Sequence, residues 1–254
     1  MSALAVSGLS ARFGELQILD RVDLDVPIGE LHVLMGPNGS GKSTLCHAVM
    51  GRPGYEAEGS VKVDGVEVLG KPVEERARAG LFEGFQYPVE VAGVTLRELI
   101  AEMALVGGPE VGERALQAAV DLDLEPFLDR FVNVGLSGGE KKKSEIVQLL
   151  GLSPKAAILD EIDSGLDVDA VRDVAGAVEG MRSPGLGVLV ITHYARVLRY
   201  LDVDRVHVMM KGKIVRTGGR ELADELDAVG YEGIRKELGL GPDAGESGGF
   251  LEGL

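Results

Sequence analysis

The chain has 254 residues, of which 45% are hydrophobic, so it is long enough for one large α/β domain with a sizeable core. It carries 41 acidic and 26 basic residues, and the net charge of −15 makes a surface that repels nucleic acid and anionic lipid. The single cysteine, Cys46, excludes an internal disulfide bond. The sequence has no secretory signal pattern and no apolar run of about 18 residues, so we expect a cytoplasmic protein that does not insert into a membrane.

The first 35 residues predict antiparallel strands that lead into a buried strand. Apolar residues alternate with polar ones over residues 3–26 and become continuous over residues 31–35. Phe13 lies in the first turn region, directly before Gly14. Its planar ring has two open interpretations, since it would either stack on an adenine face or pack as an ordinary core aromatic.

The stretch GPNGSGKST follows this strand and precedes a helix-compatible stretch, which is the order that the pattern G-x-x-x-x-G-K-[ST] requires. Glycines let backbone N–H groups turn toward a phosphate chain, and a helix that starts after Lys42 adds its positive dipole end. We expect Lys42 to reach the β and γ phosphates of a nucleotide and the Ser43 hydroxyl to ligate Mg²⁺. The predicted phosphate-binding residues are Gly36, Pro37, Asn38, Gly39, Ser40, Gly41, Lys42, Ser43 and Thr44.

Residues 51–130 carry a hairpin, a strand and a helical segment. Valines alternate around an Asp64-Gly65 turn, and residues 81–86 predict a strand that ends in Gln86. Gln86 could contact a metal or a water there, although such a glutamine is more often a loop residue. Residues 95–130 have helical spacing with a Gly-Gly-Pro break, which predicts a helical lobe, about residues 90–150, inserted between two halves of the main domain.

A helix is predicted to begin at Ser137, because Ser137 and Glu140 have the spacing of a capping box. Lys141, Lys142 and Lys143 then lie near the positive end of that helix, where cations are unfavourable. A solvated run of charge is the usual explanation. After Ser-Gly-Gly, however, the run also resembles a second anion-binding site with open backbone.

Two later strands end in polar residues. The segment AAILDE places Asp160 at the carboxyl edge of a buried strand, where it would hold Mg²⁺. The adjacent Glu161 could orient or deprotonate an attacking water. Residues 186–193 form another buried strand that ends in His193, which can hydrogen-bond a γ-phosphate or that water, or be an ordinary structural histidine.

The remaining segments complete one domain over residues 1–240. Residues 168–179 predict a helix, residues 204–217 a closing hairpin, and residues 219–240 are helical in spacing. Residues 241–254 are rich in glycine and acidic residues and predict a disordered tail.

With these residues in place, the sequence resembles the ABC-type ATPases along nearly its whole length. Six segments occur in that family's order: residues 36–44 as the Walker A loop, Gln86 as the Q-loop, residues 136–140 as the signature, residues 156–161 as Walker B, residues 164–167 as the D-loop and His193 as the switch histidine. The resemblance implies an α/β fold with a mixed-sheet nucleotide-binding core, an N-terminal antiparallel β subdomain and a small inserted α-helical subdomain. It also implies ATP hydrolysis with Mg²⁺, in which Glu161, His193 and Gln86 are catalytic and Ser43, Gln86 and Asp160 ligate the metal.

In this family each nucleotide lies between two ATPase chains, so the resemblance implies a transient, ATP-dependent homodimer. Phe13 stands where family members often place an aromatic that stacks on adenine. The residues expected to complete the nucleotide site are Ser137, Gly138, Gly139, Glu140 and Asp167.

Finer features resemble one branch of the family. The segments FQYPVEVAGV, SGGEKKKSEI and LDEIDSGLDVDA resemble SufC, the ATPase branch of the SUF iron–sulfur cluster assembly machinery. This branch implies the scaffold proteins SufB and SufD as partners, contacted through residues 87–95 and the helical lobe, and no nucleic acid. Ile162 departs from the proline or serine that usually follows the glutamate, but both carboxylates are unchanged.

Other functions stay open at this point. The nucleotide-binding subunit of an ABC transporter is the main alternative. A DNA-handling ABC ATPase would need long coiled coils or a basic surface, and a module that only binds nucleotide would not need Asp160, Glu161 and His193. A further hypothesis is that a lysine among residues 141–143 pairs with Glu161 in the resting monomer and holds it away from water.

Overall fold

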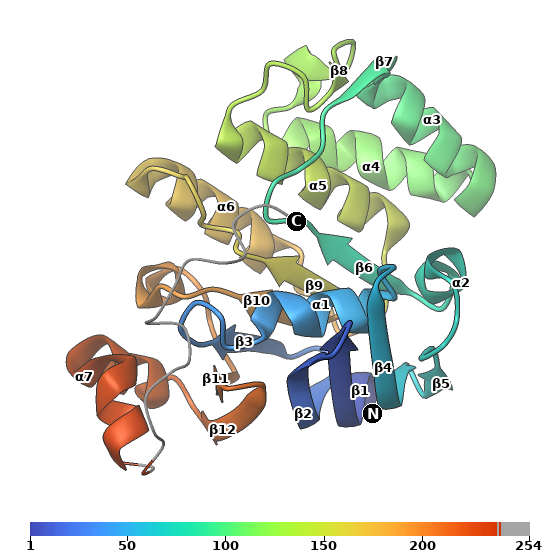
Figure 1. Cartoon of the computed structure of the whole chain (residues 1–254). Helices are drawn as coiled ribbons and strands as arrows, with labels where there is room; N and C mark the ends of the chain where they lie inside the picture. Colours follow the sequence, from blue (N-terminus) through green and yellow to red (C-terminus); the bar gives the residue numbers. More distant parts are fainter. Residues whose placement is uncertain (238, 240–254) are drawn as a thin grey trace.

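The structure is a computed structural model that describes residues 1–237 and 239. An N-terminal sheet and a core sheet pack together, and a helical lobe lies to one side of them (Figure 1). In the part of the chain that the structure describes, no helix is both long and apolar enough to cross a membrane.

The N-terminal sheet is antiparallel, in the order β2-β1-β4-β5. Leu4, Val6 and Leu24 are buried, while Ser7 and Asp25, which follow Val6 and Leu24, are exposed, so the alternation fixes which face covers the core. Its strands are β1 (Ser2–Phe13), β2 (Leu16–Pro27), β4 (Tyr55–Val63) and β5 (Val66–Glu67), and α2 (Val73–Arg78) leads out of it.

The core sheet has the order β12-β11-β3-β10-β9-β6. Its first five strands in the chain run parallel, and the last pairs antiparallel with its neighbour. Every residue of β3, β9 and β10 is buried, as a parallel sheet covered on both faces requires. The strands are β3 (Leu31–Met35), β6 (Leu81–Gly84), β9 (Ala156–Asp160), β10 (Gly187–Ile191), β11 (Arg205–Met210) and β12 (Lys213–Gly218).

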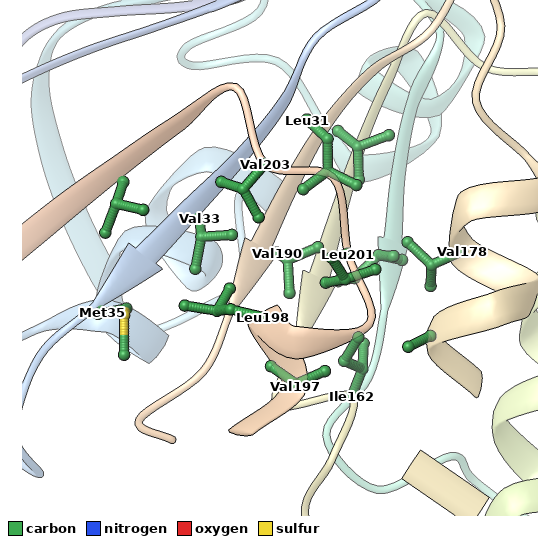
Figure 2. Close-up of a cluster of buried hydrophobic side chains, with 14 of the residues drawn as sticks. Leu31, Val33, Met35, Ile162, Val178, Val190, Val197, Leu198, Leu201 and Val203 are labelled. Carbon is green, nitrogen blue, oxygen red and sulfur yellow. The ribbon is translucent and has the colours of Figure 1, made fainter. Parts of the chain in front are cut away.

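Helices and the N-terminal sheet cover the two faces of the core sheet. On one face, α1 (Lys42–Met50) and the N-terminal sheet share a buried cluster with β3 and β10. The other face is covered by α6 (Val168–Gly180), η2 (Ala195–Arg199) and α7 (Glu221–Glu237). Figure 2 shows Val33 and Val190 of the sheet in this second cluster with Val178 of α6 and Leu198 of η2.

The helical lobe lies between β6 and β9 in the chain and has a buried cluster of its own. Thr95 and Ser137 begin its first and last helices, each as the N-cap of a capping box. Ile146 and Leu149 of the last helix also belong to the core cluster, so this helix joins the lobe to the sheet. The elements are β7 (Val91–Thr95), α3 (Leu96–Gly107), α4 (Pro109–Asp121), η1 (Glu125–Phe127), β8 (Phe131–Val132) and α5 (Gly138–Leu152).

The predicted elements are present in the predicted order, but several boundaries differ. β6 ends at Gly84 and β10 at Ile191, so Gln86 and His193 lie in loops instead of on the strands. The pair β7 and β8 was not expected, because two short strands far apart in the chain leave little pattern. The helix expected over residues 219–240 is kinked at Gly230, and the tail expected at residues 241–254 lies outside the described residues.

Candidate functional site

The loops that follow β3, β9 and β10 meet at one edge of the core sheet. β10 lies between β3 and β9, and the three strands run parallel, so their carboxyl ends are neighbours. The loop after β3 is the glycine loop, Glu161 follows β9, and His193 lies in the loop after β10. Gln86 follows β6, the strand beside β9. The topology therefore gathers these side chains from distant parts of the chain.

The glycine loop is shaped by close packing and by backbone freedom. A Cβ atom at Gly36 would lie 2.3 Å from the carbonyl oxygen of Met209, which leaves no room for a side chain. Gly41 has a φ of 109° and is the N-cap of α1. Within the described chain, α1 has no side-chain cap, so its first N–H groups are left for another acceptor. A phosphate is the natural acceptor at such a helix start.

Lys42 is buried at the beginning of α1. Its Nζ donates to the carbonyl oxygens of Gly36 and Pro37, at 2.7 and 3.0 Å. Burial lowers the pKa of Lys42, and the nearby carboxyl groups of Glu161 and Asp160 oppose that shift. The ammonium group is thus within electrostatic reach of both carboxylates, which are more than a hundred residues away in the sequence.

Asp160, at the end of β9, is only 6% exposed. Burial raises its pKa to about 6, the Glu161 carboxylate adds to the rise, and three nearby basic side chains oppose it. Among the described residues, Asp160 Oδ1 has no hydrogen-bond partner. A buried carboxylate oxygen without a donor suits a hard cation such as Mg²⁺.

The predicted metal ligands fit Mg²⁺ in their chemistry. Ser43 has a hydroxyl, Gln86 an amide oxygen and Asp160 the unpaired carboxylate oxygen, and all three are hard oxygen donors. Among the described residues, no group of three or more His, Cys, Asp or Glu side chains could hold a metal. A Mg²⁺ ion that is bound together with substrate phosphates usually has only one or two carboxylate ligands from the protein.

Glu161, Gln86 and His193 form a polar cluster next to Asp160. Glu161 has a φ of 44°, and its N–H donates to the carbonyl oxygen of Ile191 at 2.9 Å. The Gln86 amide donates to Glu161 Oε2, and His193 Nδ1 lies 3.6 Å from Glu161 Oε1. That His193 nitrogen is buried and has no hydrogen-bond partner within the described chain. The structure thus brings the three predicted catalytic residues together.

The residues expected to complete the nucleotide site of a second chain lie at helix starts. Ser137 and Glu140 cap each other at the start of α5, through hydrogen bonds of 3.3 and 2.7 Å. Asp167 caps α6 by accepting a hydrogen bond of 2.8 Å from the Ala170 N–H. In the described chain, none of these residues makes a hydrogen bond or ion pair with residues 36–44: Ser137, Gly138, Gly139, Glu140 and Asp167.

In this structure none of the three lysines at residues 141–143 forms an ion pair with Glu161, although Lys142 lies within electrostatic reach of that carboxylate. Each lysine has another carboxylate partner, because the first turns of α5 face the loop after β6 and the side of α6. The partners are Glu90 at 2.7 Å for Lys141, Glu145 at 3.7 Å for Lys142 and Asp173 at 3.8 Å for Lys143.

Phe13 is not a core residue, because its side chain is 42% exposed. Its ring packs against Tyr55, with ring centroids 5.3 Å apart, and Tyr55 in turn hydrogen-bonds His47 of α1 at 3.0 Å. The ring is therefore held beside the helix that follows the glycine loop, with one part open to solvent. Its predicted role as an adenine platform stays a prediction.

Tyr231 is a site residue that sequence reasoning missed. Its hydroxyl donates to the carbonyl oxygen of His193 at 3.3 Å. Burial raises the pKa of Tyr231 to about 12, while a hydrogen bond from the Gly36 backbone acts in the opposite direction. The only sequence signal is Gly230, a glycine inside a helical pattern, which marks the kink that sets the direction of Tyr231.

Known proteins resemble this chain in sequence and in fold. A family model described as "ABC transporter" matches residues 19–164. "Vegetative protein 296" of Bacillus subtilis is 46% identical over 249 residues, which cover 94% of this chain and 95% of that relative. A protein of Streptococcus pyogenes serotype M3 named "Probable ABC transporter ATP-binding protein" is 44% identical over 250 residues, which cover 94% of this chain and 98% of the relative.

Solved structures agree with the sequence relatives. The ADP conformation of MJ1267, an ATP-binding cassette of an ABC transporter, matches with a TM-score of 0.76 at 29% identity. The match covers 95% of this chain and 100% of that one. Since the glycine loop, the strand-end carboxylates and the whole fold agree with these findings, this chain belongs to the ABC transporter family and is an ABC-type ATPase that hydrolyses ATP.

Proposed function

We propose that two copies of this chain close on ATP and that hydrolysis lets them separate, so that the chain acts as a clamp on a partner protein. One observation carries the proposal. The glycine loop and the Glu161 cluster lie at one edge of the sheet, whereas the exposed start of α5 makes no bond to that loop within the described chain. Two copies related by a two-fold axis would bring each half-site opposite the other.

In the proposed mechanism each chain binds the phosphates and activates the water. Lys42 exchanges the carbonyl oxygens that it now contacts for phosphate oxygens, and the N–H groups at the start of α1 bind beside it. Glu161 accepts the proton of the attacking water, while Gln86 and His193 hold Glu161 and the γ-phosphate in place. Ser43, Gln86 and Asp160 would hold Mg²⁺, which would supply positive charge against the phosphates.

A groove between β6 and the helical lobe is the proposed contact for the partner. Val89, which lines the groove, is 64% exposed, and the nearby Tyr87 is 71% exposed, which is unusual for apolar side chains on a surface with so much charge. Because Phe85 lines the groove and directly precedes Gln86, a partner seated there would respond to changes at Glu161. The apolar lining residues are Phe82, Phe85, Val89, Val91, Val94, Leu99 and Val132.

The identity of the partner has two candidates: residue patterns in this chain support one, and the comparisons with known proteins favour the other, a transporter subunit. The segments that resemble SufC support SufB and SufD, and we propose these scaffold proteins as the partners in iron–sulfur cluster assembly. The names of several relatives support the second candidate, a membrane-embedded subunit of an ABC transporter. In either assembly the chain would act from the cytoplasm.

Affinity purification of the full chain from its native cell tests the partner. Recovery of SufB and SufD, with phosphate release that rises when they are present, is the expected result. Recovery of a permease instead would establish the transporter function. Two matched variants test whether this groove is the contact surface: Val89→Asp lies in the groove, and Val66→Asp lies on β5 of the N-terminal sheet, where Val66 is 47% exposed. The first should lose the partner and the second should keep it.

A further inference from the structure

Two side chains of α5 hold both polar groups of a single peptide residue, Phe85. Glu145 Oε1 accepts a hydrogen bond from the Phe85 N–H at 2.9 Å, and Lys142 Nζ donates to the Phe85 carbonyl oxygen. Residues three apart on a helix share one face, so both side chains reach the same loop. Phe85 lies directly after β6 and directly before Gln86.

This contact is made by buried charged groups, with apolar side chains beside them and the carboxylates of Asp160 and Glu161 within electrostatic reach of Lys142. Lys142 is 4% exposed and Glu145 7%, and their charged atoms lie 3.7 Å apart. The cavity around them is lined by Leu149, Leu159 and Val174 among others. A buried ion pair is often no more stabilising than apolar residues of similar volume. The pair therefore points to a positional role more than to a contribution to stability.

The held peptide is connected to the proposed catalytic carboxylate through one residue, Gln86, and one hydrogen bond. Gln86, whose backbone is continuous with the held Phe85, donates from its side chain to Glu161 Oε2. The same helix carries Ser137 at its start, where the second chain's nucleotide is expected. A displacement of α5 would therefore be transmitted through the Phe85 peptide to the Gln86 amide and to Glu161.

We propose that Lys142 and Glu145 are positioning residues, which set Gln86 against Glu161 and thereby link the position of α5 to the readiness of the hydrolytic site. This inference rests on the proposed role of Glu161. It also explains why a lysine lies in the first turns of α5, where its charge is unfavourable for the helix: Lys142 donates a hydrogen bond to the loop after β6.

A double-mutant cycle between Glu145 and Gln86 tests the inference. In the full chain, Glu145→Ala removes the acceptor of the Phe85 N–H and should lower kcat for ATP at least about tenfold, with KM changed by no more than about twofold. Glu145→Gln keeps an acceptor oxygen and should restore part of that loss. In a Gln86→Ala background, Glu145→Ala should lower kcat little further, because the hydrogen bond from Gln86 to Glu161 is already absent.

A control and a second readout separate this inference from general damage to the fold. Arg114→Ala removes a 3.0 Å bond to the Gly151 carbonyl near the other end of α5 and should leave kcat unchanged. The side-chain amide resonances of Gln86 in NMR spectra should shift in Glu145→Ala and Glu145→Gln without any nucleotide. Unshifted Gln86 resonances, or equal losses of kcat in both backgrounds, would overturn the inference. Shifted resonances with unchanged kcat would support the positioning and count against the role of Glu161.

Discussion

At the scale of single residues, two adjacent carboxylates have different surroundings. Asp160 is buried and has an oxygen with no hydrogen-bond partner in the described chain, so it suits a cation. Glu161 faces the Gln86 amide and the His193 ring instead. Environments that differ in this way allow neighbouring acids to take separate roles in one reaction.

The first prediction concerns Glu161. Glu161→Gln keeps the shape of the side chain but removes the proton acceptor, so phosphate release should fall roughly a hundredfold or more while ATP binding is retained. Steady-state phosphate release and titration with a fluorescent ATP analogue measure the two properties. Glu113→Gln, on the exposed side of α4, is the control and should hydrolyse ATP normally. Normal turnover in Glu161→Gln would remove Glu161 from its proposed role.

The second prediction concerns Tyr231. Tyr231→Phe deletes only the hydroxyl that bonds the His193 carbonyl oxygen, so the loop after β10 should be held less firmly. If the lost hydrogen bond raises the activation free energy by about 1 kcal/mol, kcat should fall roughly fivefold. Tyr200→Phe, at an exposed tyrosine at the end of η2, is the matched control. The role of Tyr231 is refuted if both variants keep the kcat of the unaltered chain.

At the scale of elements, a chain of hydrogen bonds joins three strands of the core sheet. His32 on β3 bonds His207 on β11 at 3.0 Å, and His207 bonds Thr217 on β12 at 2.9 Å. Glu30, before β3, bonds the other nitrogen of His32 at 2.8 Å. The apolar pattern of these strands does not predict the contact, because histidine in a buried strand gives no signal about its partner.

The third prediction follows from the pKa of His207. Burial, and then the nearby His32 and Arg205, lower this pKa to about 4. The pKa of His207 is lower in the folded state than in the unfolded state. The free energy of unfolding is therefore not reduced by His207 above about pH 6.5, and it falls as the pH drops toward 4. His207 should therefore reduce the free energy of unfolding by about 1 kcal/mol between pH 7.5 and 5.5. Urea unfolding at both values measures it, and His207→Gln should show a drop smaller by that amount. An equal drop would mean that His207 does not titrate in this range.

Element types were predictable where the pattern was long and regular. The capping box at Ser137 begins α5, and the Asp64-Gly65 turn joins β4 to β5, as expected. Errors came where tertiary contacts decide the end of a strand. Gly84 is the last residue of β6 because the following peptide, at Phe85, bonds side chains of α5 instead of a neighbouring strand.

At the scale of the whole molecule, each chain carries a net charge of −15, so two copies repel each other unless something binds between them. An ATP-dependent dimer is therefore the fourth prediction. Glu161→Gln with ATP and Mg²⁺ should have twice the monomer mass in light scattering, and without nucleotide it should be monomeric. A stable dimer without nucleotide would contradict the clamp.

A substitution at Ser137 sharpens this fourth prediction. Combined with Glu161→Gln, Ser137→Asp keeps a good N-cap but places a negative charge where the γ-phosphate of the second chain is expected, so the ATP-dependent dimer should be lost. Ser137→Asn keeps the cap without the charge and should still dimerise. If the aspartate variant dimerises as readily as the asparagine variant, the start of α5 does not face the nucleotide.

The sequence by itself determined the family, the order of the elements and which residue types we expect at the nucleotide site, because loop glycines, strand-end acids and helix caps are local patterns with local causes. Only the tertiary structure decided the partners of Lys142, Glu145 and Tyr231. Their side chains act on peptides far away in the chain, and no local pattern specifies which distant peptide a buried side chain will contact.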